Sequence, residues 1–273
     1  MPTIEKHAPG SFCWVELSTS DQIAAKSFYG SLFGWGADDM PMGPGDFYTT
    51  FKLNGRAAGA AYTIRPEEKS IGIPPHWNLY IAVADADDAT HRAVLLGGKV
   101  LAAAFDVFDV GRMAIVQDPT GAIFQVWQAK NMPGMGIQNE PGTFCWADLS
   151  TGDRIKAKQF YQDMFGWKMD PGQGKTDQNG YLHIKNGEHY IAGILPDTHR
   201  NPSAPPHWMP YFAVSSADET AAKAKGMGGQ VYMGPMNVDQ KLRIAILADP
   251  QGAVFALFEA GHPSGNIGAD NKG

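Results

Sequence analysis

The chain has little cysteine, little charge and no long apolar run. Two Cys occur among its 273 residues, without a Cys-x-x-Cys pair, so no disulfide framework is expected. No stretch approaches the roughly 20 apolar residues of a membrane helix, and the N-terminus lacks the apolar core of a secretion signal. A net charge of −6 argues against nucleic acid or an anionic membrane surface as partner. We therefore expect a cytoplasmic protein.

What the chain does contain is an internal repeat. Residues 9–35 and 141–167 align at an offset of 132 and share FCW, FY and FGW. Downstream, DPTGAIFQVWQA is answered by DPQGAVFALFEA. A period near 130 residues matches a whole domain. The expected organisation is a first domain at 9–130, a linker at 131–140, a second domain at 141–260 and a flexible tail at 261–273. Cys13 and Cys145 are equivalent in the two copies, which favours a buried structural role.

Each copy divides into two halves with the same order of elements. Residues 12–18 alternate as a strand does, and residues 21–33 place apolar side chains at helical spacing. Two further strands follow, joined by a tight turn at Asn54-Gly55. The second half repeats this order from residue 77. The pattern predicts four β-α-β-β-β units.

Two motifs give this arrangement a family resemblance. Asp21 is followed by Phe28-Tyr29 and Phe33-Gly34, and a DPxG turn precedes an apolar strand near the end of each copy. The chain resembles the vicinal oxygen chelate superfamily, which includes glyoxalase I, bleomycin-resistance proteins, fosfomycin-resistance enzymes and extradiol dioxygenases. The resemblance implies an α+β fold of two tandem domains, each an open half-barrel of mixed sheet with outer helices.

The resemblance also implies which side chains face the cavity. Neighbouring residues of a strand point to opposite faces, and the family geometry places the Trp14 side of the first strand inward. The ligand-binding candidates on that side are Trp14, Asn78, Tyr80, Gln125, Trp127, Trp146, Met209, Tyr211 and Phe258. Aromatic walls with isolated polar groups suit a flat or amphipathic small organic ligand. Alternatively, these aromatic residues simply fill the cavity or pack between the copies.

Metalloenzymes of this family bind a divalent ion through His and Glu, and the resemblance assigns those positions here. The first copy holds Trp14, Asn78 and Gln125, and the second holds Trp146, Met209 and Ala256. Indole cannot coordinate these ions and neutral amides are poor ligands for them. We therefore predict no metal and no other cofactor. The alternative is a relocated site combining Glu16 or Asp148 with His183 and His189.

An acidic residue recurs on the inward face of both copies, as Glu16 and Asp148. Burial against aromatic side chains would raise the pKa of such a carboxyl group and make it a candidate general base. The alternative is a structural carboxylate, hydrogen-bonded to strand ends or paired with a Lys or Arg. His76 and His207 recur in a Pro-Pro-His-Trp loop, where a structural role is favoured over a catalytic one.

These features predict a small-molecule-binding protein of the glyoxalase and bleomycin-resistance type, with metal-independent lyase or isomerase activity on an apolar or aromatic metabolite. Two alternatives stay open. One is a non-catalytic drug-sequestering resistance protein, and the other is a divalent-metal enzyme with relocated ligands. The expected partner is a small organic ligand, with no nucleic acid and no membrane, and a homodimer is compatible with the sequence.

Overall fold

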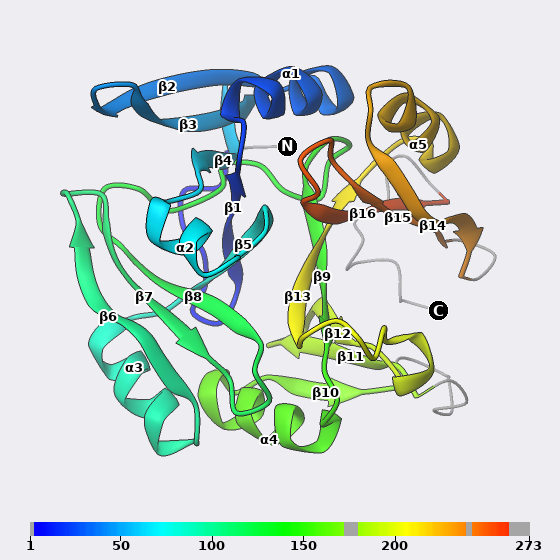
Figure 1. The fold of residues 1–273 in the computed structure, drawn as a ribbon. Coiled ribbons are helices and arrows are strands. Elements are labelled where there is room, and N and C mark those ends of the chain that lie inside the picture. The colour runs from blue at the N-terminus through cyan, green and yellow to red at the C-terminus, as the bar shows by residue number, and fades with distance from the viewer. Residues whose placement is uncertain (1–2, 172–179, 239–241, 262–273) are drawn as a thin grey trace.

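The computed structural model describes residues 3–171, 180–238 and 242–261. Almost all of the tail expected at 261–273 therefore lies outside the described residues. Each copy of the repeat forms one sheet of eight strands (Figure 1). The result is the α+β fold that the resemblance implies.

The first sheet has the strand order β2-β3-β4-β1-β5-β8-β7-β6. Its elements are β1 (Phe12–Thr19), α1 (Gln22–Phe33), β2 (Gly36–Gly43), β3 (Asp46–Leu53), β4 (Arg56–Thr63), β5 (His76–Ala82), α3 (Ala86–Leu95), β6 (Lys99–Val107), β7 (Gly111–Gln117) and β8 (Ile123–Ala129). Strand β1 pairs with β4 in parallel and with β5 in antiparallel fashion, so two β-α-β-β-β units join at the centre of one sheet.

The second sheet repeats this order as β10-β11-β12-β9-β13-β16-β15-β14. Its elements are β9 (Phe144–Ser150), α4 (Arg154–Phe165), β10 (Lys168–Asp170), β11 (Leu182–Asn186), β12 (His189–Ile194), β13 (His207–Ala213), α5 (Ala217–Gly226), β14 (Gln230–Asn237), β15 (Leu242–Ala248) and β16 (Val254–Ala260). The four predicted units are confirmed. Two short helices, α2 (Pro66–Ser70) and η1 (Asp197–His199), were not expected.

Local signals explain where the first helix of each copy begins and ends. The Asp21 carboxylate accepts a hydrogen bond from the amide of Ala24 at 2.9 Å, which satisfies a free donor at the start of α1. Gly34 ends this helix in the left-handed conformation, with φ of 75°. Asp153 and Gly166 do the same for α4. The motif that carries the family resemblance is therefore partly a pair of helix caps.

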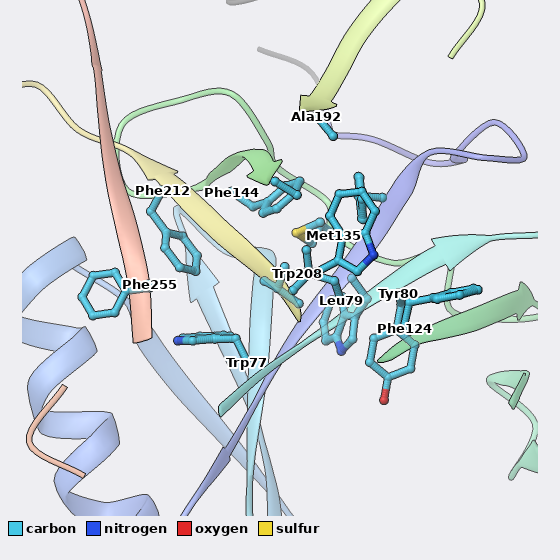
Figure 2. Close-up of a cluster of buried hydrophobic side chains, with 14 of the residues drawn as sticks. Trp77, Leu79, Tyr80, Phe124, Met135, Phe144, Ala192, Trp208, Phe212 and Phe255 are labelled. Atoms are coloured by element: carbon cyan, nitrogen blue, oxygen red, sulfur yellow. The ribbon is translucent and has the colours of Figure 1, made fainter. Parts of the chain in front are cut away.

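The two sheets pack together through one aromatic core. The ring of Trp77 in β5 lies 5.2 Å from Phe212 of β13, and Phe212 lies 6.0 Å from Phe255 of β16. Figure 2 shows these three side chains grouped between strands of both sheets. The helices also pair across the copies, because α1 lies beside α5 and α3 beside α4 (Figure 1).

The FY motif of each copy meets the DPxG turn of the other copy across this core. Tyr29 of α1 donates a hydrogen bond at 3.0 Å to Asp249, in the DPxG turn of the other copy. Tyr161 of α4 donates at 3.0 Å to Asp118, in the DPxG turn of the first copy. We call these two contacts the tyrosine–aspartate clamps. Each FY motif and each DPxG turn thus helps to hold the two copies together.

The segment expected to be a linker lies packed across the first sheet. Met135 and Ile137 are buried, and the amides of Met135 and Gly136 donate to the carbonyls of Cys13 and Ala57. A Cβ atom at Gly134 would lie 2.2 Å from the Cys13 carbonyl oxygen. This close approach requires glycine. The segment is therefore packed against the first sheet and hydrogen-bonded to it.

The two cysteines sit at equivalent irregularities of the first strand. The pairing register shifts between Phe12 and Trp14, and between the partners of Tyr211 and Phe212. Both thiols are buried and free, and each lies within 3.6 Å of a facing carbonyl oxygen, that of Tyr80 or Tyr211. Burial raises the pKa of both thiols. Their role is structural, as the repeat indicates.

Candidate functional site

Strand register brings the first-copy candidates onto one face of the sheet. Trp14 pairs with Tyr80, and Glu16 pairs with Asn78. In the next strand, Gln125 pairs with Tyr80 and Trp127 pairs with Ala82. We call this the inner face, because the opposite side of β8 carries Phe124, which packs on the other copy. All six of these candidates are less than 10% exposed.

The Glu16 carboxylate is held by two tyrosines. Tyr48 of β3 donates to one oxygen at 2.7 Å, and Tyr80 of β5 donates to the other at 2.7 Å. The indole nitrogen of Trp14 donates in turn to the Tyr48 hydroxyl at 3.1 Å. Burial raises the pKa of Glu16 above its ordinary value, and the hydrogen bonds from the tyrosines only partly oppose that shift.

The second copy builds the same arrangement around Asp148. Tyr181 and Tyr211 donate to its two oxygens at 2.6 Å each, and the Trp146 indole donates to one of them at 3.1 Å. Burial again raises the pKa of the carboxyl group. Within the described part of the chain, neither Glu16 nor Asp148 forms an ion pair. We call the two groupings the carboxylate–tyrosine sites.

Sequence reasoning found one tyrosine of each site and missed the other. Tyr80 and Tyr211 were candidates, whereas Tyr48 and Tyr181 were not. The register shows that Tyr48 and Tyr181 are equivalent. Glu16 pairs with Ala60, which pairs with Thr50, and Tyr48 lies two residues before Thr50. In the same way Asp148 pairs with Gly193, which pairs with His183, and Tyr181 lies two residues before His183. Their offset is 133 rather than 132, which hid the match in a direct comparison of the copies.

A glycine makes room for the tyrosine in the second copy. Gly193 of β12 pairs with Asp148, and a Cβ atom there would lie 1.8 Å from the Tyr181 hydroxyl oxygen. The first copy carries Ala60 at the matching position. The second site therefore depends on glycine at this one point of the strand.

Burial and the nearby carboxylates raise the pKa of all four tyrosines well above the ordinary range, for Tyr48, Tyr80, Tyr181 and Tyr211. The hydroxyl groups therefore stay protonated at neutral pH. They can act as neutral hydrogen-bond donors to a carboxylate or to a developing negative oxygen.

The other candidates differ between the copies. Gln125 donates to the Asn78 side-chain oxygen at 2.7 Å, whereas the second copy has Met209 and Ala256 at these positions, both buried. Trp127 lies over Gly111 and donates to the Met132 carbonyl, and its counterpart Phe258 packs 6.4 Å from Tyr211. The first inner face is thus the more polar one.

The residues at the family's metal positions do not form a metal site. Trp14 and Gln125 donate hydrogen bonds to other side chains. Among the residues that the structure describes, no three His, Cys, Asp or Glu side chains lie close enough to share an ion. For the relocated set, His183 packs against Trp146 and Tyr181, while His189 is exposed beside the hairpin turn. The described residues at these positions therefore supply no set of ligands suited to a divalent ion.

The repeated histidines fix their loops. His76 and His207 each place the Nδ1 atom 2.8 Å from a carbonyl oxygen two residues earlier, that of Pro74 or Pro205. This geometry agrees with the structural role favoured from the sequence.

In the described residues, no helix is long and apolar enough to cross a membrane.

The fold and the paired sites define a class of protein, and comparison with known families agrees. The sequence model of the Glyoxalase/Bleomycin resistance protein/Dioxygenase superfamily matches residues 11–126 and again residues 143–257. The chain belongs to this superfamily, in two tandem copies.

Several relatives match almost the full length of the chain. The chain is 42% identical over 260 residues to "Putative glyoxylase CFP32" of Mycobacterium tuberculosis, covering 95% of this chain and 98% of that protein. It is 35% identical to the anthracycline biosynthesis protein DnrV of Streptomyces peucetius, covering 97% of this chain and 99% of that protein.

Solved structures show the same fold at low identity. The Mn(II)-bound glyoxalase of Novosphingobium aromaticivorans superposes with a TM-score of 0.64 at 16% identity, covering 92% of this chain and 82% of that one. The 2,3-dioxygenase LapB of Pseudomonas sp. KL28 gives 0.63 at 13% identity, covering 96% and 94%.

Proposed function

We propose that this protein binds a flat, largely apolar organic molecule against its inner faces and transfers a proton within it, without a metal, as a lyase or isomerase. Glu16 and Asp148 are the proposed general bases. The observation that carries the proposal is the duplicated carboxylate–tyrosine site, in which two phenols hold a buried carboxyl group that forms no ion pair with any described residue. A carboxyl group with a raised pKa is a stronger base than an exposed one.

The chemistry needs no oxidant and no added group. The ionised carboxylate removes a proton from a carbon next to a carbonyl, and the C–H electron pair moves to form an enolate. A tyrosine hydroxyl donates a hydrogen bond to the negative oxygen, which stabilises it. Return of the proton to another carbon completes an isomerisation, and expulsion of a leaving group completes an elimination.

Two features support a flat ligand. Tyr80 bonds Glu16 directly, Trp14 bonds it through Tyr48, and the Trp127 ring lies 6.3 Å from that of Tyr80. Such aromatic side chains favour stacking on planar rings. The relative DnrV is named for anthracycline biosynthesis, and anthracyclines are planar polycyclic compounds. The other relative is named as a glyoxylase, which fits chemistry next to a carbonyl.

Non-catalytic sequestration is the second candidate function. It is favoured by the fact that phenol hydroxyl groups already occupy both oxygens of each carboxylate. These hydrogen bonds oppose the rise in the pKa of each carboxyl group and so weaken it as a base, whereas a carboxylate that only anchors a ligand needs no basicity.

The test is proton exchange into 2-tetralone, a bicyclic ketone with acidic carbon hydrogens, followed by NMR in deuterated buffer. We expect the wild-type protein to accelerate deuterium uptake and the Glu16→Gln, Asp148→Asn double variant to lose about a hundredfold or more of that rate. Asp46→Asn, which changes an exposed acid on β3, should keep the full rate.

The same samples separate the two candidates when binding is followed by tryptophan fluorescence. Wild-type binding without exchange would favour sequestration. Exchange that survives in the double variant would show that the carboxyl groups are structural and would contradict the proposal.

A further inference from the structure

The first inner face contains a buried acceptor with no donor. Gln125 is 3% exposed, and no group among the described residues donates to its side-chain oxygen Oε1. Buried polar atoms are nearly always hydrogen-bonded, because leaving one unsatisfied forfeits its interaction with water. An acceptor left open in this place needs a partner that the chain itself does not supply.

The orientation of the amide follows from its neighbours. The Nε2 group of Gln125 donates to Asn78 Oδ1 at 2.7 Å, and the Nδ2 group of Asn78 is directed at the Tyr62 hydroxyl at 3.5 Å. Gln125, Asn78 and Tyr62 thus form a row in which each amide donates one hydrogen bond to the next residue. The group left over at the end of the row is the Gln125 oxygen, which can only accept.

The second copy lacks this row. Met209 stands in the place of Asn78 and Ala256 in the place of Gln125, and both are fully or almost fully buried. The surrounding carboxylate and tyrosines are nevertheless preserved in both copies. The two inner faces therefore share a carboxylate–tyrosine site but differ in the polar group beside it.

We propose that the first sheet alone recognises the polar head of the ligand, and that this head is a hydrogen-bond donor, an O–H or N–H on a flat aromatic ring, received by Gln125 Oε1. The inference rests on the proposed function, since it names the chemistry of the molecule bound on the first inner face. Asn78 is a positioning residue, because it holds the Gln125 amide in the orientation that offers the oxygen.

The ligand must supply a hydrogen-bond donor, because the open group on the first inner face, Gln125 Oε1, can only accept. Glu16, when ionised, also only accepts hydrogen bonds. A ligand hydroxyl that reaches Gln125 satisfies the open acceptor, whereas a methyl ether at the same position brings a second acceptor and leaves both unsatisfied. Sites that hydrogen-bond a ligand group discriminate strongly against analogues without it. The second copy, with a thioether and a methyl group there, has no such preference.

The test compares 2-naphthol with 2-methoxynaphthalene, in which a methyl group replaces the hydroxyl hydrogen, by quenching of tryptophan fluorescence. We expect the wild-type protein to bind 2-naphthol about tenfold more tightly. Gln125→Met should abolish that preference by weakening 2-naphthol alone. The control Gln230→Met makes the same change at an exposed position of β14 and should keep the preference. 2-Naphthylmethylamine distinguishes an N–H donor from an O–H donor.

A second variant guards against misfolding of the first. Asn78→Met copies the residue of the second sheet, frees the Gln125 amide to turn, and should also reduce the preference for 2-naphthol. A preference that persists in both folded variants would overturn the inference. So would a Gln125→Met variant that is more stable to heat and binds 2-naphthol as well as the wild type, because the open acceptor would then be a structural defect or a water site only.

The outcomes also separate this inference from the proposed function. Equal binding of 2-naphthol and 2-methoxynaphthalene by the wild type would leave the binding face in place and refute donor recognition alone. Failure of all three probes to bind would count against the proposed function, and the inference would fall with it.

Discussion

Removal of one hydroxyl group from a tyrosine–aspartate clamp should destabilise the whole protein. Tyr29 is fully buried, donates to Asp249 at 3.0 Å and accepts from the Trp77 indole at 3.2 Å. In Tyr29→Phe the ring stays in the core, while the aspartate loses a donor and the indole loses its acceptor. A hydrogen bond to a charged group contributes about 1.5–3 kcal/mol and an unsatisfied buried donor costs about 1–3 kcal/mol. We expect the free energy of unfolding to fall by about 2.5–6 kcal/mol, the sum of these two contributions.

The repeat supplies an independent replicate of this experiment. Tyr161 makes the same two contacts, with Asp118 at 3.0 Å and the Trp208 indole at 2.8 Å, so Tyr161→Phe should cost a similar amount. The two losses should nearly add in the double variant if the clamps act independently.

The assay is urea unfolding followed by both tryptophan fluorescence and far-ultraviolet circular dichroism. Because one core joins the two sheets, both probes should report a single transition in the wild type. Tyr232→Phe removes the hydroxyl of an exposed tyrosine on β14 and should change the free energy of unfolding by less than about 0.5 kcal/mol. A loss below that value for both clamp variants would refute the reasoning.

Two further predictions concern the carboxylate–tyrosine sites. Gly193→Ala should displace Tyr181 from Asp148 and cost about 1–3 kcal/mol in thermal unfolding, whereas Ala60→Gly at the matching position of the first copy should cost only about 1 kcal/mol; similar effects of the two changes would contradict the steric argument. Folding raises the pKa of Glu16 above its ordinary 4.5, so above that pH the folded state binds more protons than the unfolded state and stability falls as the pH rises. The stability of Glu16→Gln relative to the wild type should therefore increase from pH 4.5 towards neutrality, and a difference that stays flat or declines in urea unfolding at several pH values would contradict the shift.

The sequence alone predicts the fold well because the repeat doubles every signal. Helix caps such as Asp21 and Gly34, and the turn at Asn54-Gly55 with φ of 51° and 75°, depend on local chemistry that short stretches of sequence contain. The short helix α2 was missed although Pro66 begins it and Glu68 accepts a hydrogen bond from the Arg65 amide, because its five residues include no buried side chain and so show no apolar periodicity.

The candidate site was only partly predictable. Alternation along one strand places Glu16 on the same face as Trp14, but the partner across two strands depends on register, which the sequence does not specify. This is why Tyr48 and Tyr181 escaped notice. The clamps escaped for a related reason, because no pattern within one copy says that Tyr29 will meet a turn of the other.

A carboxyl-carbon NMR titration of Glu16 and Asp148 in chelator-treated protein tests the central claim most directly, namely that each sheet holds a buried acid that forms no ion pair with the described residues and binds no metal ion. The account predicts titration midpoints above the ordinary 4.5 for Glu16 and 3.8 for Asp148, unchanged by one equivalent of Zn(II) per sheet. Midpoints at or below those values, or movement of both resonances when the metal is added, would contradict it.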